Sequence, residues 1–165
     1  MKIYTKKGDA GETDLLRRRV KKNDLHIEVN GQLDEVMATI LVAKQYISNH
    51  DHLEALDRIH HILYQMAYEI ALDDLKQIKV FEDDVLWLEK MIDQLDEILK
   101  PLTKFIQLDE SKSAAWINMC RVKTRTAERY MIELNDHKEV NTYTLKFLNR
   151  LSDYFFTIGR IYNKS

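Results

Sequence analysis

Residues 112–137 are KSAAWINMCRVKTRTAERYMIELNDH, a stretch that contains neither glycine nor proline. Its apolar residues recur three and four positions apart, the spacing that places side chains on one face of an α-helix. The stretch ends in Asn135-Asp136-His137, a polar sequence typical of a turn. We therefore predict one long helix here, which begins near Lys112 and runs through Ala114, Ala115, Met119, Val122, Ala127 and Met131.

Four further segments carry the same periodicity, at about residues 24–48, 51–75, 82–99 and 141–162. Asp51 is the candidate cap of the second helix, and Pro101 follows the third. The chain has only 4 glycines and 1 proline among 165 residues, which disfavours a sheet protein with many tight turns. Long helices with short connections pack best as an up-and-down bundle, so we predict an all-α fold of five helices.

The length of 165 residues is that of one domain, in which we distinguish a leader, residues 1–23, from a helical bundle, residues 24–165. The single cysteine, Cys120, cannot form an internal disulfide, so we expect a reducing, cytoplasmic location. No stretch is apolar enough for a signal peptide or a membrane span, and we therefore expect no membrane partner.

Charge is distributed unevenly along the chain. The first 22 residues contain eight basic and three acidic side chains, a net charge of +5, whereas the net charge of the whole chain is -2 and that of the remainder is -7. A nucleic-acid surface usually makes a whole domain basic. A basic leader on an acidic body instead favours a local anion site and no nucleic acid partner.

The leader sequence TKKGDAGETDL, residues 5–15, places two glycines among hydroxyl, basic and acidic side chains. Such a loop can turn its backbone amides toward a phosphate, although it lacks the ending of a Walker loop. The alternative is a solvated turn. The run RRRVKK, residues 17–22, leaves the same choice between an anion or partner patch and a solvated charge run.

The helix at residues 112–137 also carries a charged stripe of Arg121, Arg125, Glu128 and Arg129. One interpretation is pairing of Glu128 with its neighbouring arginines, worth a few tenths of a kcal/mol. The other is a cleft or interface in which the guanidinium groups hold a polyphosphate.

Two polar residues elsewhere are candidates for a site. Asp34 lies between Leu33 and Val36, where a buried carboxylate needs a cation unless it stands at the rim of the apolar face. Asn149 interrupts an aromatic, apolar helix, either facing solvent or serving the site.

Taken together, the motifs resemble the PduO-type ATP:cob(I)alamin adenosyltransferases over nearly the whole chain. The segments that carry the resemblance are IYTKKGDAGETDL from Ile3, KND from Lys22, GQLDE from Gly31, KFI from Lys104, RVKTRTAER from Arg121 and NRLSDYFF from Asn149.

The resemblance implies transfer of the 5′-deoxyadenosyl group of ATP to cob(I)alamin or a related corrinoid, with release of triphosphate. It also implies a homotrimer with ATP at the subunit interfaces and magnesium near Glu128 through the phosphates. Candidate partners are a reductase and an adenosylcobalamin-dependent enzyme. The ATP-binding residues implied are Thr5, Lys6, Lys7, Gly8, Thr13, Asp14, Lys22, Arg121, Arg125, Glu128, Arg129 and Asn149.

On the corrin side, the resemblance implies that Phe105 lies under the ring and keeps cobalt free of a lower nitrogen ligand, and that Asp34 pairs with Arg125. Arg125, Asp34 and Phe105 are then the catalytic set, with Phe105 and Asp34 binding the corrinoid. The cobalt is itself the nucleophile, so the chemistry belongs to the cofactor and the protein supplies alignment and charge stabilisation.

The chain departs from the family pattern at three places. Leu-Asp-Glu-Ser at residues 108–111 replaces a Pro-Gly-Gly turn. Arg17 and Arg18 stand where glycine is usual, and His26 stands where arginine is usual. The altered loop at residues 108–111 motivates one alternative, a non-catalytic relative that binds nucleotide or corrinoid as a carrier or sensor. The other alternative is a helical interaction protein whose basic leader docks an acidic partner or nucleic acid.

Overall fold

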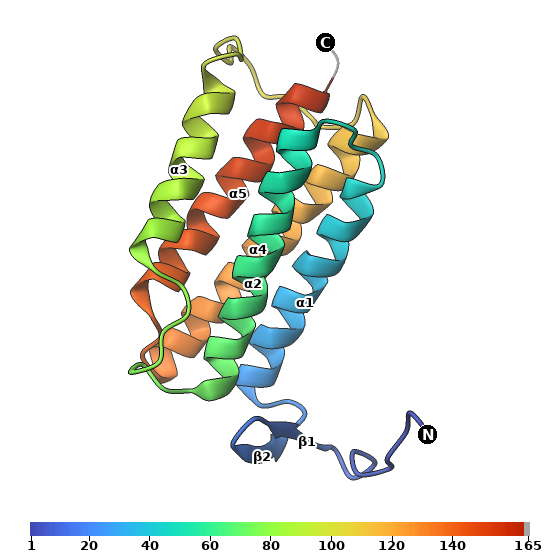
Figure 1. The fold of residues 1–165 in the computed structure, drawn as a ribbon, viewed down its shortest axis with the longest axis vertical. Coiled ribbons are helices and arrows are strands. Elements are labelled where there is room, and N and C mark those ends of the chain that lie inside the picture. Colours follow the sequence, from blue (N-terminus) through green and yellow to red (C-terminus); the bar gives the residue numbers. More distant parts are fainter. Residues whose placement is uncertain (164–165) are drawn as a thin grey trace.

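A computed structural model gives the fold and describes residues 1–163. Within this part of the chain the predicted all-α fold of five helices is confirmed, with two short strands before the first helix (Figure 1). The elements are β1 (Glu12–Leu15), β2 (Arg18–Lys21), α1 (Leu25–Lys44), α2 (His50–Leu72), α3 (Glu82–Asp96), α4 (Lys112–His137) and α5 (Thr142–Tyr162).

The five helices lie side by side and alternate in direction (Figure 1). Helix α4 packs against both α1 and α5, while α2 packs on α1 and α3 packs on α5. The interior is mainly apolar, because the buried face of each helix carries mostly aliphatic or aromatic side chains. Its fully buried members include Leu33, Ile40, Met66, Met131, Phe147 and Phe155.

The helix ends differ from the predicted ones where local capping decides them. Helix α2 begins at His50, because the Asn49 side chain accepts a hydrogen bond from the His52 N–H at 3.0 Å. The prediction of Asp51 as the cap was therefore wrong. Helices α1 and α3 end at Lys44 and Asp96, a few residues earlier than their apolar patterns suggested.

The leader contains an antiparallel hairpin that the sequence did not predict. Strands β1 and β2 pair Thr13 with Val20 and Leu15 with Arg18. Only two of their side chains, Leu15 and Val20, are buried. The sequence therefore lacks the alternation of apolar and polar residues that predicts a strand. The hairpin lies beyond the start of α1, and the residues before it extend away from the helices (Figure 1).

The helices separate two groups of loops. The hairpin, the α2–α3 connection and the α4–α5 connection lie at one end of the bundle, and the α3–α4 connection, residues 97–111, lies at the other (Figure 1). At 1.5 Å per residue, α4 alone spans about 39 Å between these ends. None of the helices in the described part of the chain is long and apolar enough to cross a membrane.

The α3–α4 connection is fixed to the bundle by Leu108, which is only 3% exposed. The Leu108 side chain packs against Gly159 of α5 so closely that a Cβ on Gly159 would stand 2.6 Å from Leu108 Cδ1. Asn163 also holds the loop, since its side-chain amide donates to the Gln107 carbonyl at 2.9 Å and its Oδ1 accepts from the Glu110 N–H at 3.1 Å. The connection is thus an ordered loop anchored on α5.

We predict that Gly159→Ala lowers thermal stability although alanine is the better helix former. Overpacking costs about 1–3 kcal/mol and the gain in helix propensity returns about 1 kcal/mol, so the net loss is up to about 2 kcal/mol and Tm should fall by up to about 8 °C in calorimetry. In a Leu108→Ala background, where the clash is absent, the same substitution should be neutral or stabilising. An equal loss of Tm in both backgrounds would contradict this packing account.

Candidate active site

The leader forms a compact loop in which Lys22 returns to Gly8. The Lys22 Nζ lies 3.0 Å from the point that a Cβ on Gly8 would occupy, so a larger residue at position 8 would force the Lys22 side chain to shift. The Lys22 N–H donates to the Gly11 carbonyl at 2.8 Å, which closes the loop at its base. The chain thus brings Gly8 and Lys22, two of the predicted nucleotide-binding residues, into contact.

Arg19 organises the rest of the leader, although the sequence did not single it out as a site residue. Its guanidinium donates to Asp14 Oδ1 at 3.0 Å, to Glu12 Oε2 at 3.4 Å and to the Lys7 carbonyl. The hydrogen bond to Asp14 is the main reason that the pKa of Arg19 is raised. The Asp14 carboxylate is therefore already paired with a cation of the same chain, Arg19. No spacing in the sequence indicated this pairing.

Thr5, Lys6 and Lys7 form an exposed turn before the hairpin. Lys6 has a φ of 62°, and the Lys7 N–H donates to the Thr5 hydroxyl at 3.4 Å. A non-glycine residue in the left-handed region is uncommon and often stands at a binding site. Thr13 lies on β1, half-buried, opposite Val20.

The stripe on α4 lies along the outer side of the bundle. Arg121 Nε donates to Asn118 Oδ1 at 2.9 Å, and Arg129 Nη2 donates to Thr126 Oγ1 at 3.3 Å. Arg125 is exposed and has no hydrogen bond or ion pair within residues 1–163. In the described part of the chain no salt bridge joins Glu128 to these arginines, although the charges of Arg125 and Arg129 both lower the pKa of its carboxyl group.

Glu128 is the half-buried member of the stripe. Burial raises the pKa of its carboxyl group, the charge of Arg125 opposes the shift, and the charge of Asp153 adds to it. Asp153 and Asn149 are exposed residues of α5, which packs against α4. The arrangement therefore places two carboxylates and several arginines on neighbouring helices. Asp153 lies within the motif NRLSDYFF, but nothing in the sequence pattern indicated it as a site residue.

Asp34 is exposed on α1, so the hypothesis that it is buried in the apolar face is wrong and the rim interpretation holds. Within residues 1–163 it forms no ion pair with Arg125. The ion pair that joins α1 to α4 is made by its neighbour, between Glu35 Oε2 and Lys123 Nζ at 2.5 Å. The pairing that the resemblance implied for Asp34 is thus absent among residues 1–163 of a single chain.

Phe105 is 92% exposed in the α3–α4 connection, at the end of the bundle opposite the leader. The loop borders a hollow of about 610 Å³ whose wall includes Lys104, Ile106 and Arg160. Arg160 donates to the Lys100 carbonyl at 2.5 Å, which holds the loop against α5. The predicted nucleotide loop and the predicted corrin residue are therefore at opposite ends of one chain, with the stripe on α4 between them.

Comparison with known proteins identifies the family. The family model for cobalamin adenosyltransferase matches residues 3–162. A corrinoid adenosyltransferase of Bacillus subtilis is 36% identical over 168 residues, which cover 99% of this chain and 87% of that protein. The corrinoid adenosyltransferase MMAB of Mus musculus is 35% identical over 169 residues, covering 96% of this chain and 71% of that protein.

Solved structures agree with the sequence relatives. A variant PduO-type ATP:co(I)rrinoid adenosyltransferase from Lactobacillus reuteri, complexed with ATP, has a TM-score of 0.91 at 31% identity and covers 98% of this chain and 94% of that chain. A second variant from that organism, complexed with cobalamin and ATP, has a TM-score of 0.89 at 30% identity, covering 98% and 93%. With sequence, family model and fold in agreement over nearly its whole length, this chain belongs to the cobalamin adenosyltransferase family.

Proposed function

We propose that this protein transfers the 5′-deoxyadenosyl group of ATP to cob(I)alamin or a related corrinoid, forming adenosylcobalamin and releasing triphosphate. The observation that carries the proposal is Arg125, an exposed guanidinium on α4 without a partner in the described chain, in a family of adenosyltransferases. A planar guanidinium fork suits a phosphate, and leaving it unpaired keeps its donors available for the ligand.

The leader would hold the nucleotide. Its exposed turn offers backbone amides and the hydroxyl and ammonium groups of Thr5, Lys6 and Lys7, while Gly8 gives Lys22 room to approach. Thr13 and Asp14 stand on β1 beside this loop. Backbone amides and lysines together form the kind of concavity that binds phosphate groups, which supports the assignment of these residues to ATP.

The stripe on α4 would receive the leaving triphosphate. The Co(I) electron pair attacks C5′ of the ribose, a Co–C bond forms, the C5′–O bond breaks, and the bonding electrons leave with the triphosphate oxygen. Arg121, Arg125 and Arg129 would stabilise the charge that develops there, and Asn149 would add an amide donor or acceptor from α5. No proton has to move at carbon, so no protein general base is required.

Magnesium would enter with the phosphates of ATP. Glu128 and Asp153 fit this ion, since Mg²⁺ prefers oxygen ligands and is usually held by one or two carboxylates together with substrate phosphates. When bound, the ion would neutralise part of the triphosphate charge. Its positive charge would also relieve the electrostatic cost of two carboxylates near each other.

A homotrimer with sites between subunits would complete this arrangement. The leader makes its side-chain contacts to the bundle with His26 of α1 and with Asp73 and Asp74 at the end of α2, and none in the described chain reaches the stripe on α4. The residues before the hairpin extend away from their own bundle (Figure 1). A neighbouring copy could therefore supply the stripe, and Asp34 and Arg125 are both exposed for contacts of this kind.

Arg125→Ala should lower kcat by about 10²–10³-fold, because one preorganised donor to the leaving charge is lost. The assay mixes chemically reduced cob(I)alamin, ATP and Mg²⁺ under anaerobic conditions and follows the loss of Co(I) absorbance. Arg58→Ala, an exposed arginine on α2, is the matched control and should keep full activity. A fully active Arg125→Ala enzyme would overturn the site assignment.

Phe105→Ala should slow the reaction far more with Co(II) corrinoid and a reductant than with prereduced Co(I), because the side chain is proposed to keep the lower ligand away from cobalt. The Kd for ATP, measured by calorimetry, should change less than about twofold, because Phe105 lies outside the proposed nucleotide site. Leu102→Ala tests another exposed apolar residue of this loop. Equal wild-type rates from both cobalt states in Phe105→Ala would refute the role.

Glu128→Gln should raise Tm at neutral pH and increase the Mg²⁺ concentration needed for half-maximal activity. Burial raises the folded-state pKa of Glu128, so its charged form destabilises the fold once the pH exceeds that pKa. The Tm difference from wild type should shrink as the pH falls from about 8 to about 4. A difference independent of pH would show that the carboxylate is not under this constraint.

A further inference from the structure

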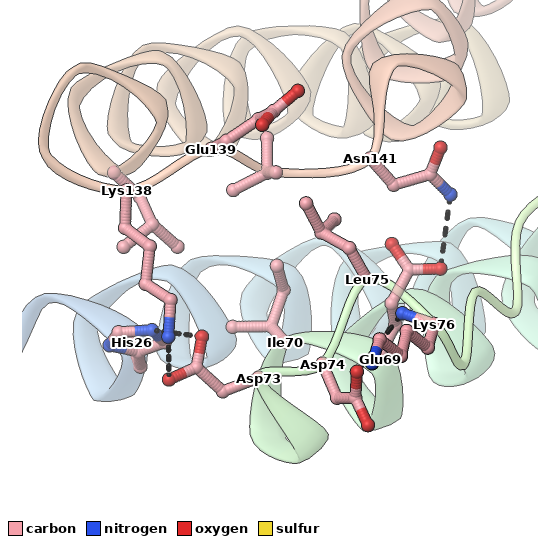
Figure 2. Close-up of a pocket in the computed structure, with 12 residues that line it drawn as sticks. His26, Glu69, Ile70, Asp73, Asp74, Leu75, Lys76, Lys138, Glu139 and Asn141 are labelled. Carbon is pink, nitrogen blue, oxygen red and sulfur yellow. Dashed lines mark hydrogen bonds and ion pairs between the residues drawn. The ribbon is translucent and has the colours of Figure 1, made fainter.

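Asp73 joins three parts of the chain at the end of the bundle that carries the leader. Its carboxylate lies 2.6 Å from Lys138 Nζ at the end of α4, 3.2 Å from His26 Nε2 on α1, and 3.4 Å from Arg18 Nη2 on β2. Figure 2 shows His26 and Lys138 converging on Asp73 at one side of a hollow of about 310 Å³. Three basic side chains from separate elements thus share one carboxylate.

The backbone presents Asp73 to this cluster. Asp73 ends α2 in the left-handed region, with a φ of 53°, and its N–H donates to the Glu69 carbonyl at 3.1 Å. Burial alone would raise the pKa of Asp73, but the hydrogen bond from Lys138 and the charge of His26 outweigh burial and lower it. The carboxylate is therefore held in its charged form, able to bind all three partners.

Contacts next to Asp73 strengthen the connection to the leader. Arg17 Nη1 lies 3.7 Å from Asp74 Oδ2, so consecutive leader arginines meet consecutive aspartates. Asp24, the cap of α1, accepts from the His26 N–H at 2.9 Å and lies 3.0 Å from His26 Nδ1. The His26 ring is thus between two carboxylates, which fixes the start of α1 to the end of α2.

We propose that Asp73 is a positioning residue that holds the β1–β2 hairpin, and through it Lys22, in place for ATP; this inference rests on the proposed function. Arg18 is on β2, and Lys22 follows the last residue of that strand. Because β2 is short and hydrogen-bonded to β1, the position of Arg18 also determines the position of Lys22. A leader that is ordered before ATP arrives avoids the entropy cost of ordering on binding, and affinity is therefore higher.

The effect should fall on nucleotide affinity and leave chemistry and global stability nearly unchanged. Asp73 touches none of the residues assigned to the triphosphate on α4, and its ion pairs to Arg18 and Lys138 involve half-exposed basic side chains. Ion pairs of that kind contribute little to global stability. The leader buries only Leu15 and Val20 in its hairpin, so its position depends strongly on these polar contacts.

The test is Asp73→Asn, which removes the charge and keeps a side chain that tolerates the left-handed backbone. In the cob(I)alamin assay, KM for ATP should rise about five- to tenfold while kcat changes less than about twofold. Asp83→Asn, an exposed aspartate of α3, is the control. Unchanged KM, or a loss confined to kcat, would overturn the proposal.

Two further measurements separate this inference from the proposed function. Without ATP, trypsin should cleave after the leader arginines faster in Asp73→Asn than in wild type and Asp83→Asn, a result that requires no enzymatic activity. Adding Arg18→Gln to Asp73→Asn should not speed cleavage after Lys22 any further, a site that both variants keep, since both substitutions break the contact between Arg18 and Asp73. Equal cleavage rates, or additive effects of the two substitutions, would show that Asp73 does not hold the leader.

Discussion

The length of the helices is the constraint on which the rest of the structure depends. Because each residue of an α-helix adds 1.5 Å, the packing of α4 between α1 and α5 sets a fixed separation between the two ends of the bundle. The buried side chains of this packing, such as Met131 and Phe155, hold the outer face of α4 in place. The leader at one end and Phe105 at the other are positioned by the same core.

The charged side chains of the candidate site differ in whether they already have an ion-pair partner in the described chain. In the leader, Arg19 is paired with Asp14 and Glu12, which gives the loop its shape before any anion binds. On α4, Arg125 has no hydrogen-bond or ion-pair partner among residues 1–163. The pKa of Glu128 is raised because its carboxyl group is partly buried and lies near the charge of Asp153. An ATP–magnesium complex would satisfy both, since its phosphates suit the arginines and its cation suits the carboxylates.

Sequence periodicity predicted the helices well because their apolar faces repeat over many turns. It failed for the hairpin, whose two buried residues give no pattern, and for Asp34, because spacing alone does not separate the centre of an apolar face from its rim. The Asp73 cluster was missed since its members lie far apart along the chain and meet only through the fold. The family followed from motifs, whereas the roles of individual site residues stay predictions.

Our proposal is that the leader and the stripe form one adenosyl-transfer site contributed by two copies of the chain. Its most direct test is activity after Lys22→Ala and Arg125→Ala chains are unfolded together and reassembled. In a closed ring of randomly mixed copies, about a quarter of the sites would join an intact leader to an intact stripe, so about a quarter of wild-type cob(I)alamin turnover should return. Reassembled mixtures that stay as inactive as either variant alone, beside active wild-type protein treated identically, would contradict the account.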